Sequence, residues 1–230
     1  MTPGQRNHFP LDRKNILSFP RIKEKSKKIH YCKGRNGKIT TWHLGGGHKR
    51  LYRQLENSFG IIEGFEHDPN RTTWISRVFH PDFYSHSYQL ATVKTSRGDV
   101  IRDKVQPGHR LSLTKIPLGS LVSNIENKYI KGAGTYGQLV QKTKTSVRVK
   151  LPSGEYKVFP LEALATLGRL CGEERKLVKL GKAGRNRWLG RRPTVRGVAI
   201  NPIDHPHGGG EGRTSGGRPS VTPWGKPTKR

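Results

Sequence analysis

The sequence predicts an all-β protein of two small barrels in tandem, with irregular basic extensions at its N- and C-terminal ends. Short segments with alternating or β-branched residues, separated by glycine, proline and charged turns, fill the middle of the chain. Helical periodicity is scarce there. Both ends combine positive charge with glycine and proline, which leaves little apolar surface to offset the entropy of ordering.

The first barrel is expected to contain strands over residues 88–93 and 109–114, because both runs alternate or carry β-branched side chains between turn residues. The boundary between the barrels is expected near Ile116 and Pro117. Two later segments, 161–166 and 173–180, have enough helical periodicity to predict short helices of about two turns each.

The second barrel is predicted from residues 121–125 and 135–140 and from a hairpin that follows them. In residues 147–151 valine and leucine alternate with basic residues, which indicates one buried and one solvated face. Pro152-Ser153-Gly154 supplies a turn, and residues 155–159 return as the partner strand.

Charge limits the classes of partner. The chain has 44 Lys and Arg against 16 Asp and Glu, a net charge of +28, with 31% hydrophobic residues. Residues 1–60 carry a net +11, residues 61–180 +8 and residues 181–230 +9. Such a surplus opposes compaction unless a polyanion screens it, and nucleic acid is favoured over a membrane surface because the cations lie among glycine and proline instead of on an amphipathic helix.

The compartment is expected to be intracellular and reducing. No apolar stretch is long enough for a membrane helix or a secretion signal. Cys32 and Cys171 lie far apart and form no CxxC pair, so neither a disulfide framework nor a cysteine zinc site is indicated.

Residues 132–137 match GxGxxG, the pattern of a dinucleotide-binding loop. That loop needs a strand before it and a helix after it, whereas Thr135, Tyr136 and Val140 favour a following strand. A turn between strands is the preferred interpretation.

Residues 204–212, with the sequence DHPHGGGEG, allow three interpretations. His205, His207 and Asp204 are possible metal ligands, but no further ligand cluster accompanies them. Either histidine is a possible general base oriented by Glu211 or Asp204, but no nucleophile is evident. The third interpretation, RNA packing, is favoured because glycine admits close backbone approach and imidazoles offer planar donors.

Clusters of glycine, aromatic and cationic residues recur elsewhere. Trp42 adjoins Gly45-Gly46-Gly47-His48-Lys49-Arg50, and Trp188 and Trp224 stand in similar surroundings. Aromatic faces stack on unpaired bases, so these three tryptophans are assigned to RNA, whereas Trp74 in an apolar run is assigned to the core. Residues 191–197 carry arginines without compensating acids, which favours phosphate neutralisation.

Several blocks together resemble the family of universal large-subunit ribosomal protein number two, in its bacterial and organellar type. They follow the family's order from about residue 30 to the end. The blocks are Gly45–Arg53, Asp68–Arg71, Ile116–Ser120, Ala133–Tyr136, Ala165–Gly168, Leu180–Gly184, Arg192–Gly197 and Asn201–Gly212.

The resemblance implies an OB-fold RNA-binding domain over residues 31–116 and an SH3-like barrel over 117–181. A basic N-terminal extension, 1–30, and a C-terminal extension, 182–230, would thread into large-subunit rRNA. It also implies that the protein organises rRNA near the peptidyl transferase centre and supports association with the small subunit. Its partners would be rRNA and neighbouring ribosomal proteins, with no membrane and no small-molecule substrate.

The residues, taken with the resemblance, predict an RNA-binding set and no catalytic or metal-binding residues. No cofactor is expected, and Mg²⁺ shared with rRNA is left open. An RNA-acting enzyme using His205 or His207 as acid–base catalyst, and a general nucleic-acid condenser, are the alternatives. The predicted RNA-binding residues are Trp42, Gly45, Gly46, Gly47, His48, Lys49, Arg50, Arg53, Arg71, Lys182, Arg185, Arg187, Trp188, Arg191, Arg192, Arg196, His205, His207, Gly208, Gly209, Gly210, Arg213 and Trp224.

Departures from the family pattern bear on location. Residues 127–131 stand where the family has a longer Gly- and Lys-rich segment, and the basic tail stops at Arg230. Residues 79–86 have no counterpart in the family pattern. Such trimming resembles organellar versions, so a ribosome in the mitochondrial matrix is expected, with plastid or bacterial cytoplasm as the alternative. Residues 1–30 lack a clean amphipathic helix, and no import presequence is expected there.

Overall fold

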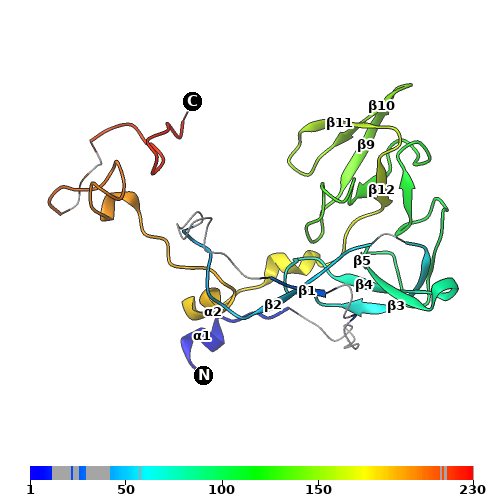
Figure 1. Cartoon of the computed structure of the whole chain (residues 1–230), viewed down its shortest axis with the longest axis horizontal. Coiled ribbons are helices and arrows are strands. Elements are labelled where there is room, and N and C mark those ends of the chain that lie inside the picture. The colour runs from blue at the N-terminus through cyan, green and yellow to red at the C-terminus, as the bar shows by residue number, and fades with distance from the viewer. Residues whose placement is uncertain are drawn as a thin grey trace. The chain divides into compact units, whose positions relative to one another are not determined.

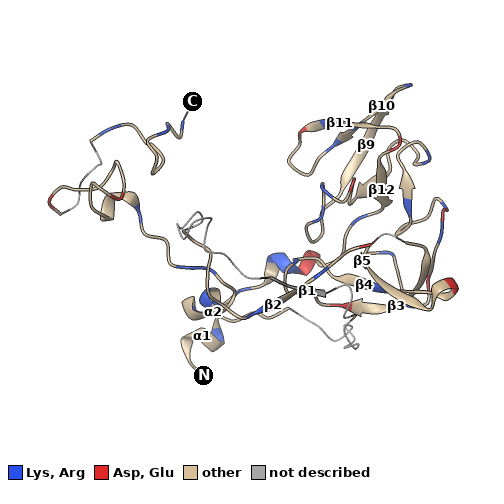
Figure 2. Ribbon diagram, in the orientation of Figure 1, with Lys and Arg blue, Asp and Glu red and all other residues tan. Residues whose placement is uncertain are grey.

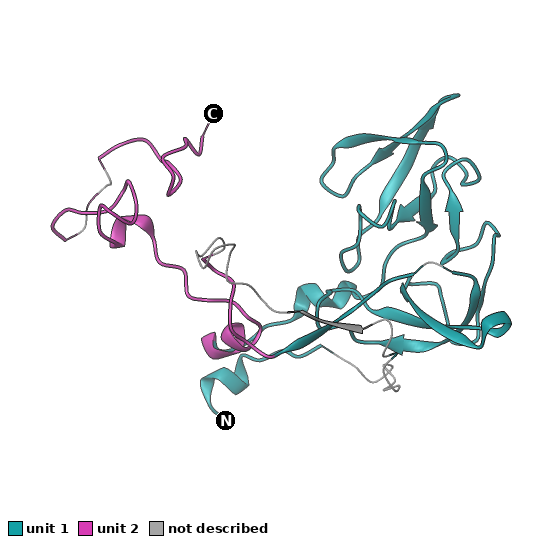
Figure 3. Cartoon of the chain, viewed as in Figure 1, with its two compact units in different colours: residues 1–30, 49–182 teal, residues 31–48, 183–230 magenta. Residues whose placement is uncertain are grey.

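A computed structural model of the chain describes residues 1–11, 22, 26–29, 42–56, 58–212, 214 and 217–229. Most of its regular structure is strand and its helices are short, so the all-β prediction is confirmed (Figure 1). The chain forms two compact units, shown in different colours in Figure 3. We call residues 1–30 with 49–182 the barrel unit, and residues 31–48 with 183–230 the loop unit.

The barrel unit contains a four-stranded antiparallel sheet with the order β5-β4-β3-β6. Buried and half-buried residues alternate along β3 (Gly60–Glu66), as expected for a strand in a sheet with one covered face. Ile62, Val78 and Ile101 pack on one another, and Ile75 packs with Tyr88. The strands are β3 (Gly60–Glu66), β4 (Ile75–His80), β5 (Ser85–Leu90) and β6 (Val100–Ile101).

A second, six-stranded sheet has the order β11-β10-β9-β8-β12-β7. Its core contains Leu111, Val122, Leu139 and Val149. The strands are β7 (Arg110–Ser112), β8 (Leu121–Ser123), β9 (Gly137–Lys142), β10 (Ser146–Lys150), β11 (Tyr156–Pro160) and β12 (Leu164–Leu167). A separate antiparallel pair joins β1 (Ser26–Ile29) to β2 (Arg50–Arg53).

The predicted hairpin is confirmed. Strands β10 and β11 pair with Val149 opposite Lys157, and Gly154 adopts φ +91° in the turn between them. Val147 and Val149 are fully buried, while Arg148 and Lys150 are exposed, as the alternation predicted. The GxGxxG segment is also a turn that leads into β9.

The helix predicted over 161–166 is wrong, because the chain forms β12 there. Ala165 and Leu167 are buried, and β12 pairs with β7 on one side and β8 on the other. Pairing on both sides satisfies the backbone and overrides a weak local preference for helix. The helix predicted over 173–180 is a single 3₁₀ segment, η3 (Glu173–Leu177).

The pairing of β7 with β12 also bears on where the two barrels divide. Leu111, Leu113 and Ile116 share one core with the six-stranded sheet, although the sequence-based division assigns them to the first domain. The division into residues 31–116 and 117–181 remains a prediction.

The remaining helices are short, and none in the described ranges is long and apolar enough to cross a membrane. The barrel unit has α1 (Pro3–Arg6) and η2 (Pro81–Phe83), and the loop unit has α2 (Ala183–Trp188) and η4 (Gly197–Ala199). Over its described residues, 42–48, 183–212, 214 and 217–229, the loop unit has no buried residue. Turns and backbone bridges hold it together instead of a core.

Candidate nucleic-acid interface

The loop unit brings together two segments that the sequence analysis treated separately. Leu44 forms a bridge with Arg191, the Gly45 N–H donates to the Gly190 carbonyl at 2.9 Å, and the His48 N–H donates to the Trp188 carbonyl at 3.0 Å. The first glycine triplet therefore lies against the predicted C-terminal extension.

The tryptophans of this unit are exposed. Trp42 and Trp224 meet edge to face, with ring centroids 5.1 Å apart and an interplanar angle of 65°. Their exposed fractions are 43% and 69%, and that of Trp188 is 57%. These indoles are exposed enough for bases to reach them, whereas Trp74, which was assigned to the core, is half-buried.

Glycine serves the packing of the loop unit itself at two of the predicted positions. A Cβ at Gly47 would lie 2.7 Å from the Gly190 nitrogen, and one at Gly208 would lie 2.3 Å from the Asn201 oxygen. The neighbours are backbone atoms, which cannot move aside cheaply. At both positions the chain's own backbone lies where a side chain would be, and the predicted close approach of RNA to these glycines stays a prediction.

His205 and His207 are held by the backbone. Their ring centroids are 4.7 Å apart, His205 Nδ1 accepts the His207 N–H at 3.0 Å, and His207 Nε2 accepts the Val221 N–H at 3.1 Å. A nitrogen already accepting a backbone N–H is not available as a general base. No group of three potential metal-ligating side chains occurs among the described residues.

Arginines of the loop unit have no ion pair with any described residue. Arg191, Arg192 and Arg196 are exposed, and Arg187 uses Nη1 to donate to the Arg191 carbonyl at 3.1 Å. Figure 2 shows few acidic positions along this unit. Unpaired guanidinium groups on a surface are suited to phosphate.

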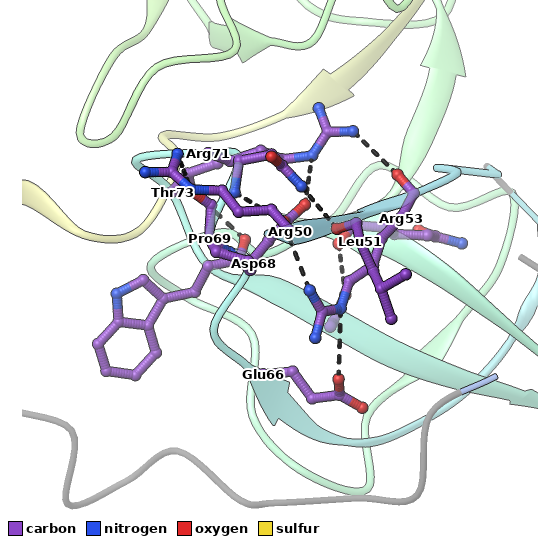
Figure 4. A network of polar contacts seen from close by, with 12 residues as sticks. Arg50, Leu51, Arg53, Glu66, Asp68, Pro69, Arg71 and Thr73 are labelled. Atoms are coloured by element: carbon purple, nitrogen blue, oxygen red, sulfur yellow. Dashed lines mark hydrogen bonds and ion pairs between the residues drawn. The ribbon is translucent and has the colours of Figure 1, made fainter. Parts of the chain in front are cut away.

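Two predicted RNA ligands have a different environment in the barrel unit (Figure 4). The Asp68 side chain is fully buried and accepts from Arg71 Nε at 2.9 Å, and Arg53 Nη1 lies 3.6 Å from its other oxygen. Arg53 Nε is also 3.9 Å from a Glu66 oxygen, and Arg50 Nη1 donates to the Pro69 carbonyl at 3.1 Å. The buried carboxylates pair with Arg53 and Arg71 inside the domain, and the predicted role of these two arginines as phosphate ligands stays a prediction.

Comparison with known proteins supports the resemblance seen in the sequence. The family model described as the RNA-binding N-terminal domain of ribosomal proteins L2 matches residues 22–102, and the one described as their C-terminal domain matches residues 106–225. The chain belongs to the ribosomal protein L2 family. The large ribosomal subunit protein uL2 of Rickettsia typhi is 46% identical over 247 aligned residues, covering 100% of this chain and 90% of the relative. That of Rickettsia akari is 45% identical with the same coverage.

Membership in the L2 family favours a structural ribosomal protein over the enzyme alternative. The only thiol in the described ranges fits this assignment, because burial raises the pKa of Cys171 to about 11 and so keeps it protonated at neutral pH. A protonated, half-buried thiol is a poor nucleophile.

The L2 residues predicted to bind RNA are distributed over both units. Lys49 and Lys182 are exposed residues of the barrel unit, which also holds the half-buried Arg50 and the Asp68-paired Arg53 and Arg71. Arg213 lies outside the described residues. The loop unit holds the remaining predicted residues, namely Trp42, Gly45, Gly46, Gly47, His48, Arg185, Arg187, Trp188, Arg191, Arg192, Arg196, His205, His207, Gly208, Gly209, Gly210 and Trp224.

Sequence reasoning missed a cavity in the loop unit of about 550 Å³. Its walls include Trp42, His43, Arg192, Asp204 and Pro223. Three segments far apart in the chain build it, so no local motif could reveal it. The carboxylate of Asp204, one of two acids in the basic residues 181–230, was the one available signal.

Proposed function

We propose that this chain is a structural constituent of the large ribosomal subunit and binds large-subunit rRNA. The observation that carries the proposal is the loop unit, which has exposed tryptophans and unpaired arginines and, among its described residues, no buried core. Such a surface is stabilised when a polyanion covers it. Membership in the L2 family, with its RNA-binding N-terminal domain, supports the same partner.

In this proposal the two kinds of side chain act differently on RNA. Arg191, Arg192 and Arg196, with Lys49 and Lys182, neutralise phosphates and fix the register of the protein on rRNA. The tryptophans of the loop unit stack on unpaired bases. The protein binds no cofactor of its own, and any Mg²⁺ at the interface is shared with rRNA phosphates.

The proposal extends to the surroundings in the ribosome. The family resemblance supports a position near the peptidyl transferase centre, contacts with neighbouring ribosomal proteins and a contribution to association with the small subunit. The RNA-acting enzyme loses support because the backbone occupies an acceptor nitrogen on both His205 and His207.

Sedimentation tests the proposal. A cell extract is fractionated on a sucrose gradient at moderate salt, and the chain is located by immunoblotting. We expect it in the peak that contains large-subunit rRNA, and we expect it to remain there when about 100 mM salt is raised to about 300 mM, because base stacking and the other contacts within the subunit add to the phosphate contacts, which salt weakens. Recovery only as free protein, or on DNA, would overturn the assignment.

We further propose that the ribosome is mitochondrial. The similar proteins named above are bacterial, and they align over 247 positions with a chain of 230 residues, so they carry residues that this chain lacks. Trimming of this kind supports an organellar version. Sequencing the rRNA in the gradient peak decides the point: mitochondrial rRNA supports it, and plastid or bacterial rRNA overturns it.

A further inference from the structure

The cavity of about 550 Å³ in the loop unit combines an aromatic wall with polar groups, and its volume falls in the range of sites for small ligands. Trp42 lines one wall. Trp224 packs edge to face against the ring of Trp42 and fixes its orientation. The cavity therefore presents a positioned aromatic face.

A carboxylate without a partner lies at the same cavity. The side chain of Asp204 is exposed and makes no hydrogen bond or ion pair within the described part of the chain. Its backbone is fixed by a turn, since the Asp204 N–H donates to the Asn201 carbonyl at 3.0 Å. Asp204 thus offers two oxygen acceptors from a fixed position.

Two residues that line the cavity, His205 and Arg192, carry hydrogen-bond donors. His205 Nδ1 is occupied by the backbone N–H of His207, so the neutral ring carries its hydrogen on Nε2. The ring is pressed against Gly197, where a Cβ would lie 2.6 Å from it. Arg192 is anchored through its backbone N–H, which donates to the His43 carbonyl at 3.0 Å, and its guanidinium group has no ion-pair partner among the described residues.

These groups match one kind of nucleotide. Guanine presents two adjacent N–H donors, at N1 and N2, which a carboxylate can accept together. Adenine and cytosine place a ring-nitrogen acceptor beside their amino group, so the lone pair of that nitrogen would face an Asp204 oxygen and repel it. Uracil has a single N–H between two carbonyl groups, so it can donate only one hydrogen bond to the carboxylate. An aromatic face and an unpaired guanidinium complete the site, for the base and for a phosphate respectively.

We infer that this cavity binds one unstacked guanosine of large-subunit rRNA, with the base on Trp42, its N1–H and N2–H on Asp204 and a phosphate at Arg192. The inference rests on the proposed function, because the guanosine belongs to the rRNA that the protein binds.

Kethoxal, which modifies guanine at N1 and N2, tests the inference on assembled large subunits. Subunits carrying the wild-type chain are compared with subunits carrying Asp204→Asn. The matched control is Glu211→Gln, an exposed acid of the same segment that does not line the cavity. We expect one guanosine, protected in wild-type and control subunits, to react about tenfold more in Asp204→Asn, the size of effect that loss of a bidentate base contact produces.

A second variant checks the stacking face. Trp42→Phe retains an aromatic ring and should keep the guanosine protected, whereas Trp42→Ala should expose the same guanosine. Comparable amounts of each chain in the subunit peak show that rRNA binding as a whole persists. If Asp204→Asn exposes no guanosine, or exposes the same ones as Glu211→Gln, the guanosine site is refuted while the proposed function stands. If the wild-type chain is absent from the subunit peak, both fail.

Discussion

The arginines around Asp68 in the barrel unit and the arginines of the loop unit have opposite environments. In the barrel unit, which has a hydrophobic core that includes Ile75 and Tyr88, Arg53 and Arg71 are turned inward onto the buried Asp68. In the loop unit Arg191 and its neighbours are exposed and lack acidic partners among the described residues. The same side chain stabilises the fold in one unit and remains free for a ligand in the other.

This contrast follows from the presence or absence of a hydrophobic core. A core excludes water around a guanidinium group, and a buried charge is tolerated only when it is paired. In the loop unit, where no described residue is buried, the arginine side chains stay hydrated and need no acidic partner. A polyanion that binds there displaces this water. Net charge alone does not distinguish the two cases.

The largest expected effect is the loss of the buried carboxylate. Asp68→Asn should lower the free energy of unfolding by about 3–5 kcal/mol, because it leaves Arg71 and Arg53 without their shared anion. Urea unfolding followed by far-UV circular dichroism measures the change. Asp82→Asn, an exposed acid of the same unit, should change it by less than about 0.5 kcal/mol. Equal effects of the two substitutions would contradict the internal role of the Asp68 network.

Sequence patterns predicted the parts of the barrel unit that depend on local signals. The hairpin of β10 and β11 follows from period-two alternation in Val147-Arg148-Val149 and from the glycine turn. Residues 161–166 were misjudged because β12 is defined by strands on both sides of it, which a local pattern does not contain.

The sequence could not predict the two environments of arginine or the assembly of the loop unit, because both depend on contacts between residues far apart in the chain. Arg53 and Arg71 lie in two family blocks of the sequence, and only the fold shows that Asp68 is buried and pairs with both. The Trp42 segment and residues 183–229 are over a hundred positions apart, yet they share backbone bridges. The residue types of the candidate site were predictable, but their assembly into a cavity was not.

An intermediate effect is expected from Gly208→Ala in the loop unit. The new Cβ would lie 2.3 Å from the Asn201 oxygen and 2.6 Å from the Ile200 oxygen, both backbone atoms, so the turn has to open. We expect about tenfold less incorporation into large subunits in competition with the wild-type chain, since overpacking typically costs about 1–3 kcal/mol. The measurement is the ratio of the two chains in the subunit peak.

Gly184→Ala is the control for that substitution. Gly184 lies in α2 with no atom near the position of the new Cβ, and alanine favours a helix, so incorporation should not fall. Undiminished incorporation of Gly208→Ala would show that the loop unit does not need its tight turn for assembly.

The smallest expected effect is on the salt dependence of RNA binding, measured for one exposed arginine of the loop unit and one Asp68-paired arginine of the barrel unit. Arg196→Gln removes an exposed, unpaired cation of the loop unit, so the slope of log binding constant against log salt concentration should become shallower by about 0.7–0.9, the value for one phosphate contact. Arg71→Gln, measured below its unfolding temperature, should leave the slope unchanged because Arg71 is paired with Asp68. Filter binding of the full chain to large-subunit rRNA between 50 and 200 mM salt gives both slopes. A shallower slope for Arg71→Gln would mean that this guanidinium leaves Asp68 for a phosphate on binding, and the division between internal and RNA-facing arginines would then hold only for the free protein.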